Sequence, residues 1–248
     1  MVSVSKYVVR PLTIAAAGML VSSVSASTAS SSSMTLMQEQ EIAPLHGPMD
    51  TDTHAGWNMD ALTGLMEITI MVHGVSVEAA KSIVVDGTAT VLRLNGAGLR
   101  AIRFLGIDFH VYVGAMYSAT PITTYEQALE AEVLHMEFTF LRGVGAGKVA
   151  EAWREQTKHS ITYHYDGYEE DIEKFIGMFG ALKNRGVEMM QIVGDETLIW
   201  DQGEFKGKIV GKDFQKAFLS MWFGEQPVSE DLRAGLLSGG LSPAAASQ

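Results

Sequence analysis

The chain has 248 residues, of which 47% are hydrophobic and 19% charged, so it can fold around a core of its own. Its 18 Lys and Arg against 29 Asp and Glu give a formal net charge of −11. This charge argues against nucleic acid or an anionic lipid surface as the main partner, because phosphate binding depends on clustered basic side chains. Cysteine is absent, which excludes disulfides, thiolate metal sites and cysteine nucleophiles.

The N-terminal 37 residues contain no acidic side chain and have the features of a targeting segment. Lys6 and Arg10 precede an apolar stretch at 12–21, and small residues follow at Val24-Ser-Ala26. We therefore predict a signal peptide over 1–26 and a secreted or periplasmic protein. The alternative is a transit peptide to a plastid or mitochondrion, since such peptides are also Ser-rich and acid-poor. A bilayer span needs about 20 apolar residues, so no integral membrane span is expected in the mature chain.

Residues 27–62 are rich in Ser, Met, Thr and Asp and show no sustained apolar period, which predicts a flexible linker. His46 and His54 lie there among acidic residues, and solvated side chains are favoured over a metal site. The remaining segment, 63–248, has the length of one domain. We predict no metal site and no cofactor.

Strands and helices are predicted from short β-branched or alternating runs and from apolar residues at helical spacing. Strand runs at both ends with helices between them predict an α+β fold, a large antiparallel sheet layered with helices. In chain order the elements are strands 67–72, 88–94 and 107–117, helix 124–130, strand 133–141, helices 148–158 and 169–182, strands 187–193, 197–201 and 204–210, and helices 213–223 and 229–237.

Two glycine-rich segments match phosphate-binding motifs only in part. Gly96-Ala-Gly98-Leu-Arg-Ala101 follows a strand as a dinucleotide fingerprint does, but another strand comes next where a helix is required. Gly143-Val-Gly-Ala-Gly-Lys148 lacks the first Gly and the magnesium-binding Ser or Thr of a phosphate loop. We interpret the second segment as a flexible entry to the following helix.

The motifs around residue 100 are those of a known family. Leu94-Asn-Gly-Ala-Gly-Leu-Arg100 followed by Phe109-His-Val-Tyr-Val-Gly-Ala-Met-Tyr117 resembles the chalcone isomerase-like family, in which a glycine turn ending in Arg precedes a strand of the pattern V-Y-x-G-x-x-Y. The runs 214–224 and 227–237 resemble its closing helices, so the similarity covers about 72–239. The resemblance implies a chalcone isomerase-like open-faced β-sandwich, with an apolar cleft between sheet and helices.

Two activities occur within that family. Plant members close a chalcone to a flavanone, and non-catalytic relatives bind fatty acids through the same Arg and a Tyr on the following strand. Arg100 and Tyr112 fit the second pattern, because Tyr112 stands where isomerases place a Thr. The isomerase Tyr, its neighbouring Asn and a later Ser or Thr align near Gly145, Ala152 and Gln215, so these polar groups are absent here.

Elementary chemistry favours the same reading of these two residues. A guanidinium can donate two parallel hydrogen bonds to a carboxylate, and a phenol can add a third. Two-residue alternation puts His110 on the Tyr112 face, as a further polar candidate. An ion pair with Asp or Glu is the alternative for Arg100. The candidates for the apolar wall, each with core packing as its alternative, are Met116, Met136, Phe138, Phe175, Met178, Phe179, Phe218 and Trp222.

We therefore expect an exported domain that binds a fatty acid or similar amphipathic carboxylate in an apolar cleft without turnover. One alternative is an intramolecular lyase of the chalcone isomerase type, in which Arg100 stabilises an enolate or phenolate electrostatically. A haem-binding or purely structural domain is the other alternative.

Overall fold

The computed structural model of the protein describes residues 68–85, 87–104 and 106–240. The predicted signal peptide (1–26) and linker (27–62) lie outside these residues, as do His46 and His54. No helix in the described part of the chain is long and apolar enough to cross a membrane.

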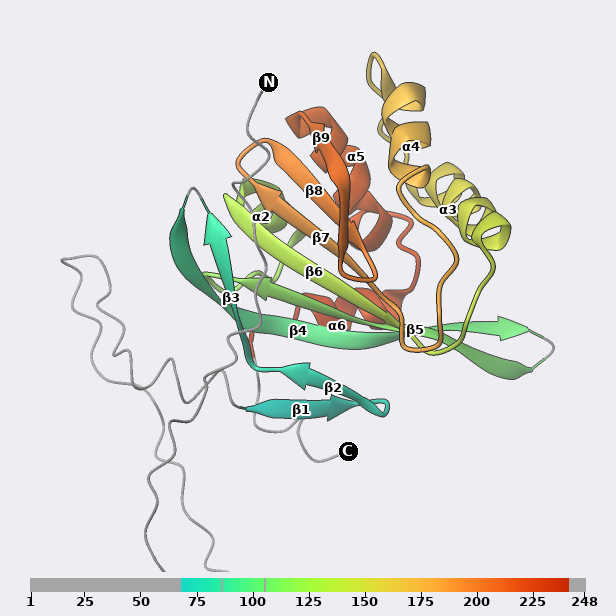
Figure 1. Ribbon diagram of the computed structural model, residues 1–248, viewed down its shortest axis with the longest axis horizontal. Coiled ribbons are helices and arrows are strands. Elements are labelled where there is room, and N and C mark those ends of the chain that lie inside the picture. Colours follow the sequence, from blue (N-terminus) through green and yellow to red (C-terminus); the bar gives the residue numbers. More distant parts are fainter. Residues whose placement is uncertain (1–67, 86, 105, 241–248) are drawn as a thin grey trace, which may run out of the picture. The chain divides into compact units, whose positions relative to one another are not determined.

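A seven-stranded antiparallel sheet carries the fold, and strands that follow one another in the chain are neighbours in it (Figure 1). An antiparallel sheet with helices inserted between its third and fourth strands and between its fourth and fifth strands confirms the α+β prediction. A separate hairpin, unpredicted in its second strand, consists of β1 (Thr69–Val72) and β2 (Val75–Glu78). The sheet strands are β3 (Ala80–Val85), β4 (Thr88–Phe104), β5 (Ile107–Ser118), β6 (Val133–Phe140), β7 (Val187–Val193), β8 (Glu196–Asp201) and β9 (Glu204–Val210).

Helices pack on one face of the sheet and the β1–β2 hairpin on the other. Between sheet and helices lies the main core, which includes Met116, Phe138 and Trp222. Alternate residues of the same strands, such as Val113 and Tyr117, form a smaller core with the hairpin. The helices are α2 (Tyr125–Glu130), α3 (Ala146–Ser160), α4 (Tyr168–Ile176), α5 (Lys212–Phe223) and α6 (Glu230–Leu236).

Helix α4 ends at Ile176, six residues before its predicted end. Gly177 caps it, and the chain beyond makes bonds to other elements in place of helical ones. The Gly180 amide donates to the Asp201 carboxylate at 3.0 Å, and Leu182 pairs with Val144 through backbone hydrogen bonds of 2.8 and 2.9 Å. These contacts turn the chain back toward β7 and place Leu182 beside the start of α3.

The glycine segment before Arg100 is not a turn, contrary to the expectation from the family pattern. Strand β4 continues through it to Phe104, and helix α6 crosses the strand at this point. A Cβ added at Gly96 would lie 2.0 Å from the Gly235 carbonyl oxygen, and one at Gly235 would lie 2.7 Å from the Ala97 carbonyl oxygen. The glycines therefore allow two backbones to approach closely, and Arg100 is held on a strand.

Replacing Gly96 by Ala is expected to lower the free energy of unfolding by about 1–3 kcal/mol, the usual cost of overpacking a core. The added methyl group meets a backbone oxygen, which cannot move unless α6 shifts. Chemical denaturation monitored by circular dichroism measures the effect. Gly147→Ala is the control, because a Cβ there meets nothing within 4 Å and Ala favours the α3 helix. Equal unfolding midpoints for both variants would contradict this account.

Candidate functional site

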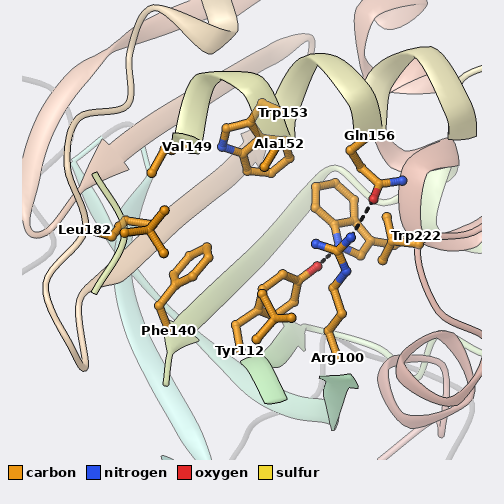
Figure 2. Close-up of a pocket in the computed structure, with 12 residues that line it drawn as sticks. Arg100, Tyr112, Phe140, Val149, Ala152, Trp153, Gln156, Leu182 and Trp222 are labelled. Carbon is orange, nitrogen blue, oxygen red and sulfur yellow. Dashed lines mark hydrogen bonds between the residues drawn. The ribbon is translucent and has the colours of Figure 1, made fainter. Parts of the chain in front are cut away.

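A small cavity of about 90 Å³ lies between the sheet and helix α3, with Arg100 at its polar end (Figure 2). Its walls come from β4, β5, β6, α3, α5 and the connections before α3, β7 and α6, so both the sheet and the helices contribute. The lining residues are Arg100, Val111, Tyr112, Phe140, Val144, Val149, Ala152, Trp153, Gln156, Leu182, Trp222 and Val228.

Arg100 holds a positive charge that no carboxylate neutralises directly. Its Nη2 donates to Gln156 Oε1 at 2.8 Å, and its guanidinium carbon lies 5.5 Å from the centre of the Tyr112 ring. The Nε atom is buried and has no hydrogen-bond partner. Of the ion pairs that the described residues form, none includes Arg100. A buried charged donor without a partner favours an anion in the adjoining space.

Tyr112 supplies a hydroxyl group beside this guanidinium. Trp222 Nε1 donates to the Tyr112 hydroxyl oxygen at 3.1 Å, so the oxygen is occupied as an acceptor while the proton remains available (Figure 2). Burial raises the pKa of Tyr112, and the positive charge of Arg100 opposes that rise. The phenol therefore stays neutral near pH 7 and can donate to an anion that Arg100 attracts.

A β-bulge aims these side chains into the cavity. Arg100 pairs with Tyr112, but the next pair is Ala101 with His110, so Val111 is an extra residue on β5. Val111 and Tyr112 both line the cavity as a result. The ring of His110 lies instead 6.0 Å from that of His73 in the β1–β2 hairpin. The expectation that His110 shares the Tyr112 face is wrong, because alternation assumed an unbroken strand.

Most of the predicted apolar wall lies one layer behind the cavity. Trp222 lines it, whereas Phe138 stacks on Trp222 at 5.0 Å and Phe179 stacks on Trp153 at 5.3 Å between ring centres. These rings hold the two tryptophans in place. The other candidates, Met116, Met136, Phe175, Met178 and Phe218, belong to the main core or pack against it without lining the cavity.

Gln156 is the polar residue that sequence reasoning missed. It forms one stripe of α3 with Val149, Ala152 and Trp153, and all four line the cavity. Their spacing of three, four and seven positions is that of one helix face, and a single polar residue in such a stripe is a detectable signal. The Gln156 amide nitrogen donates to the Ser160 hydroxyl, which fixes the oxygen toward Arg100.

Of the three positions aligned with isomerase polar groups, only Ala152 lines the cavity. Gly145 caps the start of α3, and the Gln215 side chain donates to the Gly194 carbonyl oxygen at 3.2 Å. The methyl group of Ala152 offers no hydrogen bond. The polar groups of the cavity wall are therefore those of Arg100, Tyr112 and Gln156, together with the indole N–H groups.

A buried carboxyl group lies in the core near the cavity. Glu188 of β7 pairs across the sheet with Asp201 of β8, and its two oxygens have no hydrogen-bond partner. Burial, followed by the neighbouring negative charge of Asp201, raises the pKa of Glu188 to about 8, while Trp153 opposes the shift. Glu188 therefore retains its proton at neutral pH.

One other groove of the described surface is a poor site for an anion. A wider groove beside β6 and β7 is lined by Glu130, Glu132, Asp195 and Glu196 with the single cation Lys212, and this charge repels a carboxylate. Within residues 68–85, 87–104 and 106–240, no three acidic or imidazole side chains are arranged to hold a metal ion.

Comparison with known proteins agrees with this architecture. No curated protein matches the chain. Among solved structures, the crystal structure of the Arabidopsis thaliana fatty-acid binding protein AtFAP1 is similar, with a TM-score of 0.56 and 15% sequence identity over 69% of this chain and 96% of that one. At this identity the likeness concerns the fold. A sequence match to the chalcone isomerase-like family extends over residues 70–238, which include all the cavity-lining residues, and the chain therefore belongs to that family.

Proposed function

We propose that the domain binds the carboxylate of a fatty acid or similar amphipathic acid at Arg100 and releases it unchanged. The observation that carries this proposal is the buried Arg100 Nε without a partner, beside a neutral phenol at the polar end of an apolar cavity. Charge-assisted hydrogen bonds from Arg100 and a further one from Tyr112 suit a carboxylate. The fold similarity to a protein named for fatty-acid binding supports the same choice of ligand.

The residues around the cavity favour binding over catalysis. An enzyme of this type must hold a reacting oxygen and move a proton, which requires several polar groups at defined positions. Here Arg100 and Tyr112 have only Gln156 and two indole groups beside them, and Ala152, which aligns near the Asn of the isomerase pattern, contributes only a methyl group. The raised pKa of Tyr112 makes its phenolate costly to form, which disfavours it as a general base.

The size of the cavity limits which part of the ligand is enclosed. Pockets that bury a whole drug-sized ligand measure about 300–1,000 Å³, and this one measures about 90 Å³. We infer that it encloses the head group and the first carbons. The rest of a long tail lies outside, or enters only when side chains such as Phe140 and Trp153 rotate.

Ligand identification tests the proposal directly. The purified protein is extracted with organic solvent, the extract is examined by mass spectrometry, and the delipidated protein is titrated with decanoic acid and with decanol. Trp153 and Trp222 line the cavity, so tryptophan fluorescence reports binding. The acid is expected to bind at least tenfold more tightly than the alcohol, because only the acid presents a charge to Arg100. Equal affinities and an extract free of carboxylic acids would contradict the proposal.

The same protein preparation tests the enzymatic alternative. Conversion of a chalcone faster than the uncatalysed reaction, and its loss in Arg100→Ala, would establish an intramolecular lyase in place of a carrier. A Soret band after addition of haem would instead support a haem-binding domain. We expect neither signal.

A further inference from the structure

Strands β4 and β5 continue beyond the sheet as a two-stranded ribbon (Figure 1). Strand β3 pairs with β4 only as far as Arg93, and β6 pairs with β5 only from Tyr112 onward. Residues 101–104 and 107–110 therefore pair only with each other. Isolated two-stranded ribbons are marginally stable in water, so a projecting one gains from a partner.

One face of this ribbon carries exposed apolar side chains. Ile102, Ile107 and Phe109 expose 48%, 61% and 36% of their surfaces. Ile102 pairs with Phe109, and Ile107 lies two positions before Phe109, so all three share a face. We call these three residues the apolar row. Contiguous apolar side chains at the surface of a soluble domain commonly mark an interaction site.

The apolar row lies on the same side of the sheet as the cavity. Ile102 follows Arg100 by two positions on β4, and Phe109 precedes Val111 by two positions on β5. Arg100 and Val111 line the cavity. The apolar row thus continues the cavity wall outward along β4 and β5, and no other strand lies between the row and the cavity.

One arginine lies beside the apolar row and another lies behind it. The guanidinium of Arg142 lies over the Phe109 ring, 5.6 Å from its centre. Arg103, with 74% of its side chain exposed, follows Ile102 on β4 and therefore lies on the opposite face of the ribbon, where it pairs with Asp108. Asp108 is the one acidic residue between 100 and 110, and its contact with Arg103 is long, at 3.8 Å. The ribbon with Arg142 is therefore locally cationic in a chain whose net charge is −11.

We propose that the ribbon docks on an anionic lipid bilayer, with the apolar row entering the boundary between head groups and acyl chains. Exposed apolar side chains with arginine beside them, here Arg142, are a combination that binds such an interface. The positive charge near the ribbon is local. The net charge of −11 describes the whole chain and disfavours only a broad basic surface. The bilayer is also where amphipathic acids accumulate, so docking places the cavity beside its source of ligand. That last step rests on the proposed function, but docking itself does not.

Flotation of the full-length chain with vesicles tests the proposal. Vesicles of phosphatidylcholine mixed with phosphatidylglycerol are expected to bind the protein, and vesicles of phosphatidylcholine alone to bind it more weakly. The double variant Ile107→Ser, Phe109→Ser is expected to lose at least tenfold in affinity, because it removes most of the apolar surface that the ribbon would bury in the bilayer. Arg142→Gln is expected to lose about fivefold on anionic vesicles only. The N-terminal segment is identical in all variants, so differences report on the ribbon.

Met71→Ser with Val210→Ser is the matched control, since these side chains are 66% and 54% exposed on β1 and β9. It should bind vesicles as the parent does. Unchanged binding by the ribbon variant would overturn the proposal. So would a dimer in solution that the ribbon variant converts to monomer without any vesicle binding, because the row would then contact a second copy. Neither result bears on carboxylate binding at Arg100, because that binding is measured in the absence of vesicles.

Discussion

Arg100→Ala is expected to weaken binding of decanoic acid about a hundredfold. Each hydrogen bond to a charged group contributes about 1.5–3 kcal/mol, and loss of a forked pair amounts to about 3 kcal/mol, or two powers of ten in Kd. The buried Nε without a partner and the Nη2 held by Gln156 show that the guanidinium is already positioned. Little side-chain entropy is then lost on binding. Fluorescence titration of the delipidated protein measures the change.

Two variants separate this effect from a general loss of charge. Arg100→Lys keeps the charge but loses the planar fork, so intermediate affinity is expected. Arg154→Ala removes an exposed arginine of α3 that pairs with Glu173 at 2.8 Å, and it should bind as the parent does. Decanol should bind equally to the parent and to Arg100→Ala. A parent-like Kd for the acid in Arg100→Ala, with a native circular dichroism spectrum, would rule out Arg100 as the head-group contact.

The order of elements could be read from the sequence because the signals are local. Alternation in 133–141 and helical spacing in 213–223 each depend on a few neighbouring residues, and the structure has β6 and α5 there. The length of β4 could not be read in this way. The glycines of β4 are needed because helix α6, far away in the sequence, lies against the strand there. The Asn95 side-chain amide also donates a hydrogen bond of 2.7 Å to the Leu236 carbonyl oxygen of α6.

The polar residues of the candidate site could be predicted, because the type of side chain alone indicates what it can bind. Their side-chain chemistry indicates Arg100 and Tyr112 as partners for a carboxylate, and the two residues lie together at the polar end of the cavity. The apolar wall was not predictable, because helical spacing shows that Phe175 and Phe218 point inward but not whether they meet a cavity or another ring. The position of His110 depended on a single extra residue, Val111, which reverses the alternation without changing the composition of the strand.

Glu188→Gln is expected to remove a pH dependence from the stability of the fold. Between the ordinary glutamate pKa of 4.5 and the native value of about 8, the folded protein keeps a proton on Glu188 that the unfolded chain loses. The free energy of unfolding therefore falls as pH rises through this range, by on the order of 5 kcal/mol in all, and levels off above it. Gln resembles the protonated side chain, so the variant should lack this decline and be the more stable protein at pH 8. Chemical denaturation across this range measures both.

Glu137→Gln provides the opposite case in the same sheet. Burial would raise the pKa of Glu137, but a hydrogen bond with His135 and the charge of Lys81 lower it to about 2. Its contribution to stability is present above pH 4.5 and is lost as pH falls toward 2, so Glu137→Gln should destabilise the protein at neutral pH and leave the decline toward pH 8 intact. If Glu188→Gln also kept that decline, Glu188 would not be its source.

A negative charge on Glu188 raises the pKa of Tyr112, so the two groups are coupled electrostatically. Deprotonation of Glu188 above pH 8 should accordingly weaken the binding of a carboxylate beside Tyr112 in the parent and not in Glu188→Gln.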